Sequence, residues 1–374
     1  MAITGEIDER VIGDPLQWFA TEYPALISCV QAAYDLGELS TAWELSCYLA
    51  FFFESRSQWD AWEKTHLIGL KAAIELDDAY AEACMRRGLG AMCVYRGRWA
   101  EARQNFDIAL AKIRAGNSRR WEAATVQSLG DLDRRLTNWD DALAHYDVAL
   151  EIYQDLDDML SVAAVTRCIG VIRRYQGRWE EADRFFMTAL PIVEAHSDRR
   201  SLGSLLHSIG DLRRRAGQYA EAEQYYARAA ELFESIEDRR WGSAVKRSLA
   251  DVRMRQGRYD EALALLDQAA EVFDELGDKL WGAATLRCRG DVLCALRQVD
   301  AAQSALLEAL SRFESAGDRR WMAKCHISLG DVAAGKHQVS EAIAHWRTAK
   351  KLVDGLGTAE SADISRRLEE SAQP

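Results

Sequence analysis

The chain has 374 residues, of which 48% are hydrophobic, 28% are charged and only four are proline, as expected for an ordered, helix-rich protein. Its net charge of −12 argues against a general nucleic-acid surface, because phosphate binding needs a basic face. No apolar run reaches the length of a membrane span, and the N-terminus lacks the pattern of a signal peptide. We therefore expect no membrane partner. The eight cysteines form no CxxC pair, so we expect reduced thiols and a cytoplasmic location.

Taken in order, the chain divides into a lead, two terminal helices and a long repetitive part. Residues 1–14 are expected to form a flexible lead, and residues 15–37 an N-terminal capping helix that ends before a glycine. From residue 38 to 357 we predict eight helical hairpins of 40 residues each. Residues 358–374 should form a C-terminal capping helix and tail. The segment 239–278 represents one unit, with a helix, a tight turn, a second helix and a return loop.

The period of 40 residues continues without an insertion from Trp59 to Thr358. Each unit has a small residue in the middle of its first helix, which lets the second helix approach closely. An aromatic residue opens most of the second helices and should fill the wider part of the crevice. The small residues are Ala50, Gly90, Gly130, Gly170, Gly210, Ala250, Gly290 and Gly330.

Turn residues support the same register. Glycine stands where the first helix ends in four units, as a left-handed helix stop requires, and three other units carry Thr137, Arg297 or His337 there. Each return loop ends in a good N-cap residue, which typically stabilises a helix by ~1 kcal/mol relative to alanine. These residues are Asp78, Ser118, Asp158, Asp198, Asp238, Asp278, Asp318 and Thr358. Pro191 lies late in a second helix and should kink it or shorten its last turn.

The pattern of small, aromatic and alanine positions resembles the tetratricopeptide repeat. It is visible as Leu129-Gly130, Trp139, Ala142, Tyr146 and Ala149. The resemblance covers about nine-tenths of the chain and implies an all-α, right-handed α-α superhelix of about eight hairpins with terminal capping helices. Because the usual unit has about 34 residues, each helix here should be longer.

A narrower resemblance concerns the entry segment. Residues 18–53 and 56–73, with the recurring GDRRW and SLGD phrases, resemble the start of the repeat arm in STAND-type signalling ATPases, which include SARP-like antibiotic regulators of actinobacteria. In that family the arm senses a ligand or partner and restrains the ATPase. The chain has no GxxxxGK[ST] loop. We therefore expect a stand-alone relative or an excised arm of a bacterial regulator, without ATP-driven switching.

First helices line the concave face of tetratricopeptide arrays, and counting from the small residue predicts rows of Arg and Asp there. The candidate ligand- or partner-binding residues are Arg87, Gln127, Asp131, Arg134, Arg135, Arg167, Arg174, Tyr175, His207, Asp211, Arg214, Arg215, Arg247, Asp251, Arg255, Arg287 and Asp291. One interpretation is a cationic groove for a protein segment or a small acidic ligand, since Arg binds carboxylates and phosphates bidentately. The alternative is internal neutralisation by the i,i+4 pairs Asp131–Arg135, Asp211–Arg215 and Asp251–Arg255.

Three first helices open with an Arg-Arg-Trp phrase at residues 119–121, 239–241 and 319–321. The tryptophan should pack between repeats, with a cation–π or base-stacking role as the alternative. Two middle units carry Ser161 and Ser201 instead, which leaves more room. Together with Tyr175 and His207, these serines place the expected pocket between residues 160 and 215.

No catalytic or metal constellation is recognisable. Cys325, His326 and His337 lack the spacing of zinc ligands, and His145 and His345 are expected at the surface. His207 could serve as an acid or base, but a satisfied groove histidine is the more frequent case. We therefore expect no cofactor and a non-enzymatic binding or regulatory module. The alternatives are a biosynthetic enzyme or accessory protein with a cavity near Tyr175 and His207, and a self-associating scaffold that forms homo-oligomers.

Overall fold

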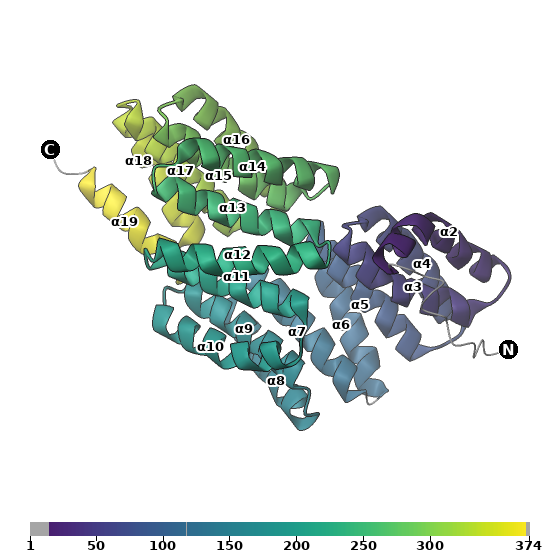
Figure 1. The fold of residues 1–374 in the computed structure, drawn as a ribbon. Helices are drawn as coiled ribbons and strands as arrows, with labels where there is room; N and C mark the ends of the chain where they lie inside the picture. The colour runs from purple at the N-terminus through teal and green to yellow at the C-terminus, as the bar shows by residue number, and fades with distance from the viewer. Residues whose placement is uncertain (1–14, 117, 372–374) are drawn as a thin grey trace.

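The computed structural model describes residues 15–116 and 118–371, and all regular secondary structure within them is α-helical. The expected lead, residues 1–14, lies outside the described residues. Helix α2 (Pro15–Asp35) precedes eight hairpins, and α19 (Glu360–Glu370) follows them (Figure 1). The hairpins are α3 (Leu39–Ser55) with α4 (Trp59–Glu75), α5 (Ala79–Tyr95) with α6 (Trp99–Ala115), α7 (Arg119–Arg135) with α8 (Trp139–Asp155), α9 (Met159–Tyr175) with α10 (Trp179–Ala195), α11 (Arg199–Arg215) with α12 (Tyr219–Ser235), α13 (Arg239–Arg255) with α14 (Tyr259–Glu275), α15 (Lys279–Ala295) with α16 (Val299–Ala316), and α17 (Arg319–Gly335) with α18 (Val339–Val353).

Each helix packs mainly on its neighbours in sequence, so the hairpins stack into a right-handed superhelical solenoid with α2 and α19 as caps. The α-helical repeat fold predicted from the sequence is confirmed. None of the described helices is long and apolar enough to cross a membrane.

The ends of the helices follow from local residue chemistry. Six of the eight expected N-cap residues, the aspartates, accept a backbone N–H with their side chains. Ser118 makes no such bond. Thr358 is not the N-cap of α19, because that helix begins two residues later with Ala359 as its N-cap. The turn residues Thr137, Arg297 and His337 have φ values of 65°, 60° and 60°, so they adopt the left-handed conformation that glycine provides in four other units.

Pro191 does not shorten its helix, so this part of the prediction is wrong. Helix α10 has 17 residues, the same length as α8 and α12. The Pro191 side chain is exposed, so its ring projects into solvent, while Ala189 and Val193 are buried in the core and hold the helix in place.

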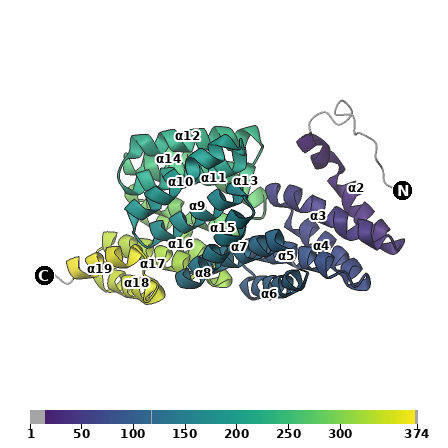
Figure 2. The same ribbon diagram turned by 90° about the horizontal axis from the view of Figure 1, so that it is seen from below.

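The superhelix is wound tightly enough for successive turns to touch. The indole nitrogen of Trp99 donates to the carbonyl of Ala316 at 2.5 Å, and Trp139 donates in the same way to Leu356, with a sequence separation of 217 in both cases. The Ala359 amide donates to the carbonyl of Tyr175 at 2.9 Å. Figure 2 shows the C-terminal helices returning toward α7 and α8. These contacts bring residues far apart in the sequence to one inner surface.

Candidate ligand-binding cavity

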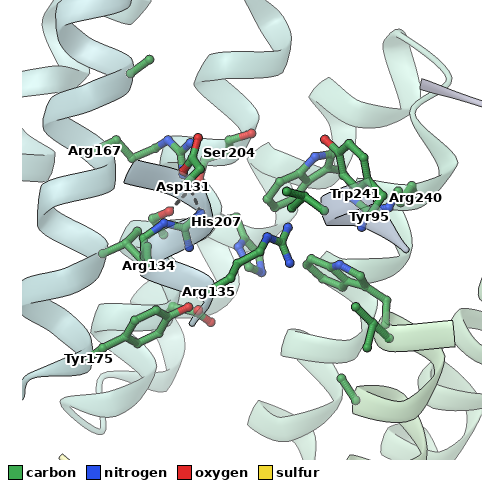
Figure 3. Close-up of a pocket in the computed structure, with 18 of the residues that line it drawn as sticks. Tyr95, Asp131, Arg134, Arg135, Arg167, Tyr175, Ser204, His207, Arg240 and Trp241 are labelled. Atoms are coloured by element: carbon green, nitrogen blue, oxygen red, sulfur yellow. Dashed lines mark hydrogen bonds and ion pairs between the residues drawn. The ribbon is translucent and has the colours of Figure 1, made fainter. Parts of the chain in front are cut away.

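The inner surface of the superhelix encloses a cavity of about 510 Å³, and all eight first helices contribute to its lining (Figure 3). A volume of this size is in the range of sites that bind small molecules or short segments. The cavity exists because the first helices face inward and the winding of the superhelix brings both ends of the array toward its middle.

Among the charged side chains of this lining, cations outnumber anions. Eight arginines face four carboxylates, although the whole chain carries a net charge of −12. The arginines are Arg134, Arg135, Arg167, Arg174, Arg200, Arg240, Arg247 and Arg320, and the carboxylates are Glu54, Asp131, Asp211 and Asp318. The charged part of the lining is therefore net positive, in contrast to the whole chain.

Nine of the seventeen candidate residues line this cavity. They are Asp131, Arg134, Arg135, Arg167, Arg174, Tyr175, His207, Asp211 and Arg247. The other eight do not line it and are Arg87, Gln127, Arg214, Arg215, Asp251, Arg255, Arg287 and Asp291. Several of these eight are satisfied within their own hairpin: Gln127 accepts from the Tyr153 hydroxyl at 3.2 Å, and Arg287 binds Asp291, one turn further along the same helix, at 2.5 Å.

The arginines that neutralise the aspartates are mostly not the ones predicted. Asp251 pairs with Arg255 at 3.8 Å as expected, but the predicted pairs Asp131–Arg135 and Asp211–Arg215 do not form. Asp131 instead binds Arg134, three residues on, at 3.0 Å.

Asp211 is bound at 2.7 Å by Arg174 of the preceding repeat, and Arg214 in turn binds Asp251 of the following one. The arginine at i+3 is favoured over the one at i+4 because a tyrosine hydroxyl bridges it to the aspartate. The Tyr226 hydroxyl, for example, donates to Asp211 and accepts from the guanidinium of Arg214. Burial alone would raise the pKa of Asp211, but Arg174, His207 and Arg214 hold it well below its usual range. These bonds join repeats into a continuous ladder and leave Arg135 and Arg215 out of it.

The tryptophans that open first helices serve both expected roles. Trp321 stacks on Phe313 of the preceding helix with ring centroids 5.3 Å apart, which is packing between repeats. Its face also receives a guanidinium, with Arg287 5.6 Å from the ring centroid. The same arrangement joins Arg87 to Trp121 at 4.7 Å and Arg247 to Trp281 at 5.0 Å. The row of arginines is thus held in place by cation–π contacts from one repeat to the next.

His207 is a satisfied buried histidine. Its Nε2 lies 2.9 Å from the Ser248 hydroxyl. Burial lowers its pKa to about 4, with nearby Asp211 opposing the shift. The ring is therefore neutral near pH 7 and supplies shape and hydrogen bonding to the wall of the cavity.

The remaining histidines and cysteines do not form a metal centre. In the described part of the chain, no three His, Cys, Asp or Glu side chains are grouped to hold a metal ion. His145 and His345 are half-buried and partnered rather than free surface groups. His145 lies 3.0 Å from the buried carboxylate of Asp133, and His345 lies 3.0 Å from His326.

Several lining residues were missed by sequence reasoning. Arg200, Arg240 and Arg320 enter the cavity from the first turns of α11, α13 and α17, and Glu54 and Tyr95 enter from the ends of α3 and α5. A signal was present, because these arginines are the second residues of the recurring Arg-Arg phrases. The phrase was assigned a packing role through its tryptophan. The arginine beside the tryptophan reaches the end of an earlier first helix, as Arg240 reaches Tyr95.

Comparison with known proteins agrees with this architecture. A tetratricopeptide-repeat family model matches residues 81–155 and 161–235, and a second model of the same repeat matches residues 247–279. A search of curated protein sequences finds no match. The fold is that of an α-helical repeat solenoid with a cavity on its axis. Within it, the matched residues are tetratricopeptide repeats.

Solved structures share the fold at low sequence identity. The Rap conjugation gene regulator of a plasmid, solved with a bound peptide, has a TM-score of 0.66 at 13% identity, covering 94% of this chain and 97% of that one. The quorum sensor NprR from B. thuringiensis has a TM-score of 0.58 at 16% identity, covering 92% and 99%. A signal transduction ATPase with a tetratricopeptide-repeat sensor from Pyrococcus horikoshii has a TM-score of 0.52 at 15% identity, covering 98% of this chain and 56% of that one.

Proposed function

We propose that this chain is a non-enzymatic regulatory module of the bacterial cytoplasm that binds a protein segment or a small acidic ligand inside its superhelix. The observation that carries the proposal is that three guanidinium groups of the lining, those of Arg135, Arg167 and Arg247, form no ion pair within the described residues. The other five are bound to carboxylates, two of which, Asp278 and Glu360, lie outside the lining. An anionic ligand would complete the charge balance there and would gain charge-assisted hydrogen bonds, often bidentate, from arginine.

The relatives support a sensor role. The plasmid regulator was solved with a peptide, NprR is a quorum sensor, and the archaeal ATPase carries its repeats as a sensor. A ligand that binds one shape of the superhelix better than another would shift the protein toward that shape, which is the basis of a ligand-driven switch.

The alternative of an enzyme is less well supported by the lining. Catalytic pockets are usually lined by apolar side chains with a few polar groups, whereas eight arginines stand among the side chains that line this cavity. His207 is neutral and occupied by Ser248, so it is poorly placed to abstract a proton.

Two cavity arginines offer a direct test. Arg167 and Arg247 line the cavity and form no ion pair in the described chain, so replacing them should remove ligand contacts without exposing a buried carboxylate. We expect native mass spectrometry to show an acidic compound or peptide on the wild-type protein. The Arg167→Gln/Arg247→Gln double variant should bind that compound at least tenfold more weakly, since about 1.4 kcal/mol corresponds to a factor of ten.

The control is Arg228→Gln/Arg258→Gln, which removes the same charge from exposed positions on second helices. Titration with a pool of acidic hexapeptides provides a second readout. Equal binding by the wild type and both double variants, or no binding by any of them in both assays, would contradict the proposal.

A further inference from the structure

The inner surface carries a second ladder, formed between successive superhelical turns. The last residue of a first helix lies against the first turn of the first helix four hairpins further along the chain. Arg240 lies over the ring of Tyr95 at 4.9 Å, and Arg320 lies over the ring of Tyr175 at 3.9 Å. In each pair the guanidinium lies against the face of the tyrosine ring, so the two side chains form a cation–π contact.

At the C-terminal end of this ladder, Arg215 and Arg320 both lie near the carboxylate of Glu360. Arg215 ends α11, and α19 presents Glu360 to it. Burial and the neighbouring Arg214 lower the pKa of Arg215, and the Glu360 carboxylate opposes this shift. Glu360 is buried and also accepts from Arg320 at 2.6 Å. The chain therefore supplies its own carboxylate where an arginine occupies the final position of a first helix.

Arg135 occupies the same final position in α7, but its counterpart in the register is Leu280. Both residues line the cavity. Leucine offers neither a charge nor a hydrogen-bond acceptor, and among the described residues Arg135 has no carboxylate within ion-pair distance. Figure 3 shows its side chain reaching into the cavity between Tyr175 and Trp241.

The surroundings of Arg135 are cationic as well. Arg134 is already bound to Asp131 at 3.0 Å, and Arg240 is bound to Asp278 at 2.7 Å. Burial lowers the pKa of Arg135, the guanidinium groups of Arg134 and Arg240 lower it further, and Asp131, which is bound to Arg134, opposes the shift. A half-buried cation beside two others is unfavourable unless an anion joins it.

We infer that Arg135 is the anchor of an oxyanion subsite, which takes a phosphate or carboxylate group of the ligand against the guanidinium that Leu280 leaves unpaired. Arg240 and Arg134 add positive potential from both sides, and their own acids hold them in position. This inference deepens the proposed function and rests on it for the larger ligand, whereas the subsite can be probed with simple anions.

The register provides a sharp substitution. Leu280→Glu would give Arg135 the carboxylate that Glu360 gives Arg215, so the protein would neutralise its own subsite. Leu280→Gln is the matched control, since it has nearly the same size and no charge. Arg135→Gln removes the anchor itself and keeps the test informative if the glutamate variant folds poorly.

The measurement is thermal unfolding of the full chain with inorganic pyrophosphate or citrate, at an ionic strength fixed with sodium chloride. We expect at least one of the two oxyanions to raise the Tm of the wild type and of Leu280→Gln. A rise with pyrophosphate alone assigns the subsite to phosphate, and a rise with citrate assigns it to carboxylates. Arg135→Gln and Leu280→Glu should bind the active anion at least tenfold more weakly.

Leu280→Glu should also melt at a higher temperature than Leu280→Gln when no oxyanion is present. Equal oxyanion effects in all four proteins, or no effect on the wild type, would overturn the inference. These outcomes are separate from the proposed function, because a peptide or metabolite could still bind through Arg167 and Arg247 in a protein whose Arg135 binds no anion.

Discussion

At the scale of single residues, close helix crossings depend on which pairs face each other. Gly130 faces Tyr146, and a Cβ atom added to this glycine would lie 2.7 Å from the tyrosine ring. The same pairing joins Gly90 to Phe106. Where the small residue is Ala250, the second helix carries Leu266 at the matching position. A Phe or Tyr ring at this position of the second helix thus faces glycine, whereas leucine faces alanine in this hairpin and Gly290 in the next one.

Gly130→Ala tests this rule. The added methyl group must displace the buried Tyr146 ring, and overpacking of a core typically costs about 1–3 kcal/mol. We expect a lower free energy of unfolding in urea. Gly242→Ala is the control, because no atom lies within 4 Å of its Cβ position, and alanine in an open helical position stabilises by roughly 0.5–1 kcal/mol. Destabilisation of both variants by the same amount would refute the rule.

At the scale of one element, α10 shows that packing can override a helix breaker. Pro191 cannot donate to the carbonyl four residues earlier, yet the helix reaches Ala195. The equivalent position holds glutamate in three other units, at residues 151, 231 and 271. The packing of the buried alanines of α10 against its neighbours thus stabilises the helix by more than proline destabilises it.

Replacing this proline should stabilise the protein. Pro191→Glu restores a backbone donor and a good helix former at an exposed site, so we expect a gain of about 1–3 kcal/mol in the free energy of unfolding, measured with urea. Ser311→Glu makes the equivalent change in α16 without removing a proline and should stay within about 0.5 kcal/mol. An unchanged midpoint for Pro191→Glu would show that the backbone of α10 is already relaxed around its proline.

At the scale of the whole molecule, the winding of the superhelix decides whether a cavity exists. Trp99→Phe/Trp139→Phe removes the two indole donors that join successive turns and keeps the aromatic rings. Each lost hydrogen bond should cost about 1 kcal/mol, so we expect a lower Tm and a larger radius of gyration by small-angle X-ray scattering. Trp179→Phe is the control, since the side chain is exposed and donates no hydrogen bond within the described residues. A radius equal to that of the wild type would mean that other contacts set the pitch.

Features that are fixed within one repeat could be predicted from the sequence, and features that depend on several repeats could not. Helix ends, turn conformations and the Gly130 crossing depend on residues within one 40-residue unit, so the period was sufficient to predict them. The place of Arg240 over Tyr95 depends on rotations accumulated over four hairpins, which no local pattern records. The Asp131–Arg135 pair failed for a smaller reason, because helical spacing allows both i+3 and i+4 partners and the Tyr146 hydroxyl, bonded to both Asp131 and Arg134, favours the first.

The bonds from Trp99 to Ala316 and from Trp139 to Leu356 have a consequence for how the chain folds and unfolds. In an ordinary repeat array each unit touches only its neighbours, so the ends fray and unfolding spreads in steps. Here the second hairpin is tied to the seventh, and neither can leave without breaking the other's contacts. Unfolding should therefore be more cooperative than in an open array. Folding should be slower, because closure must wait until contacts of very large sequence separation can form.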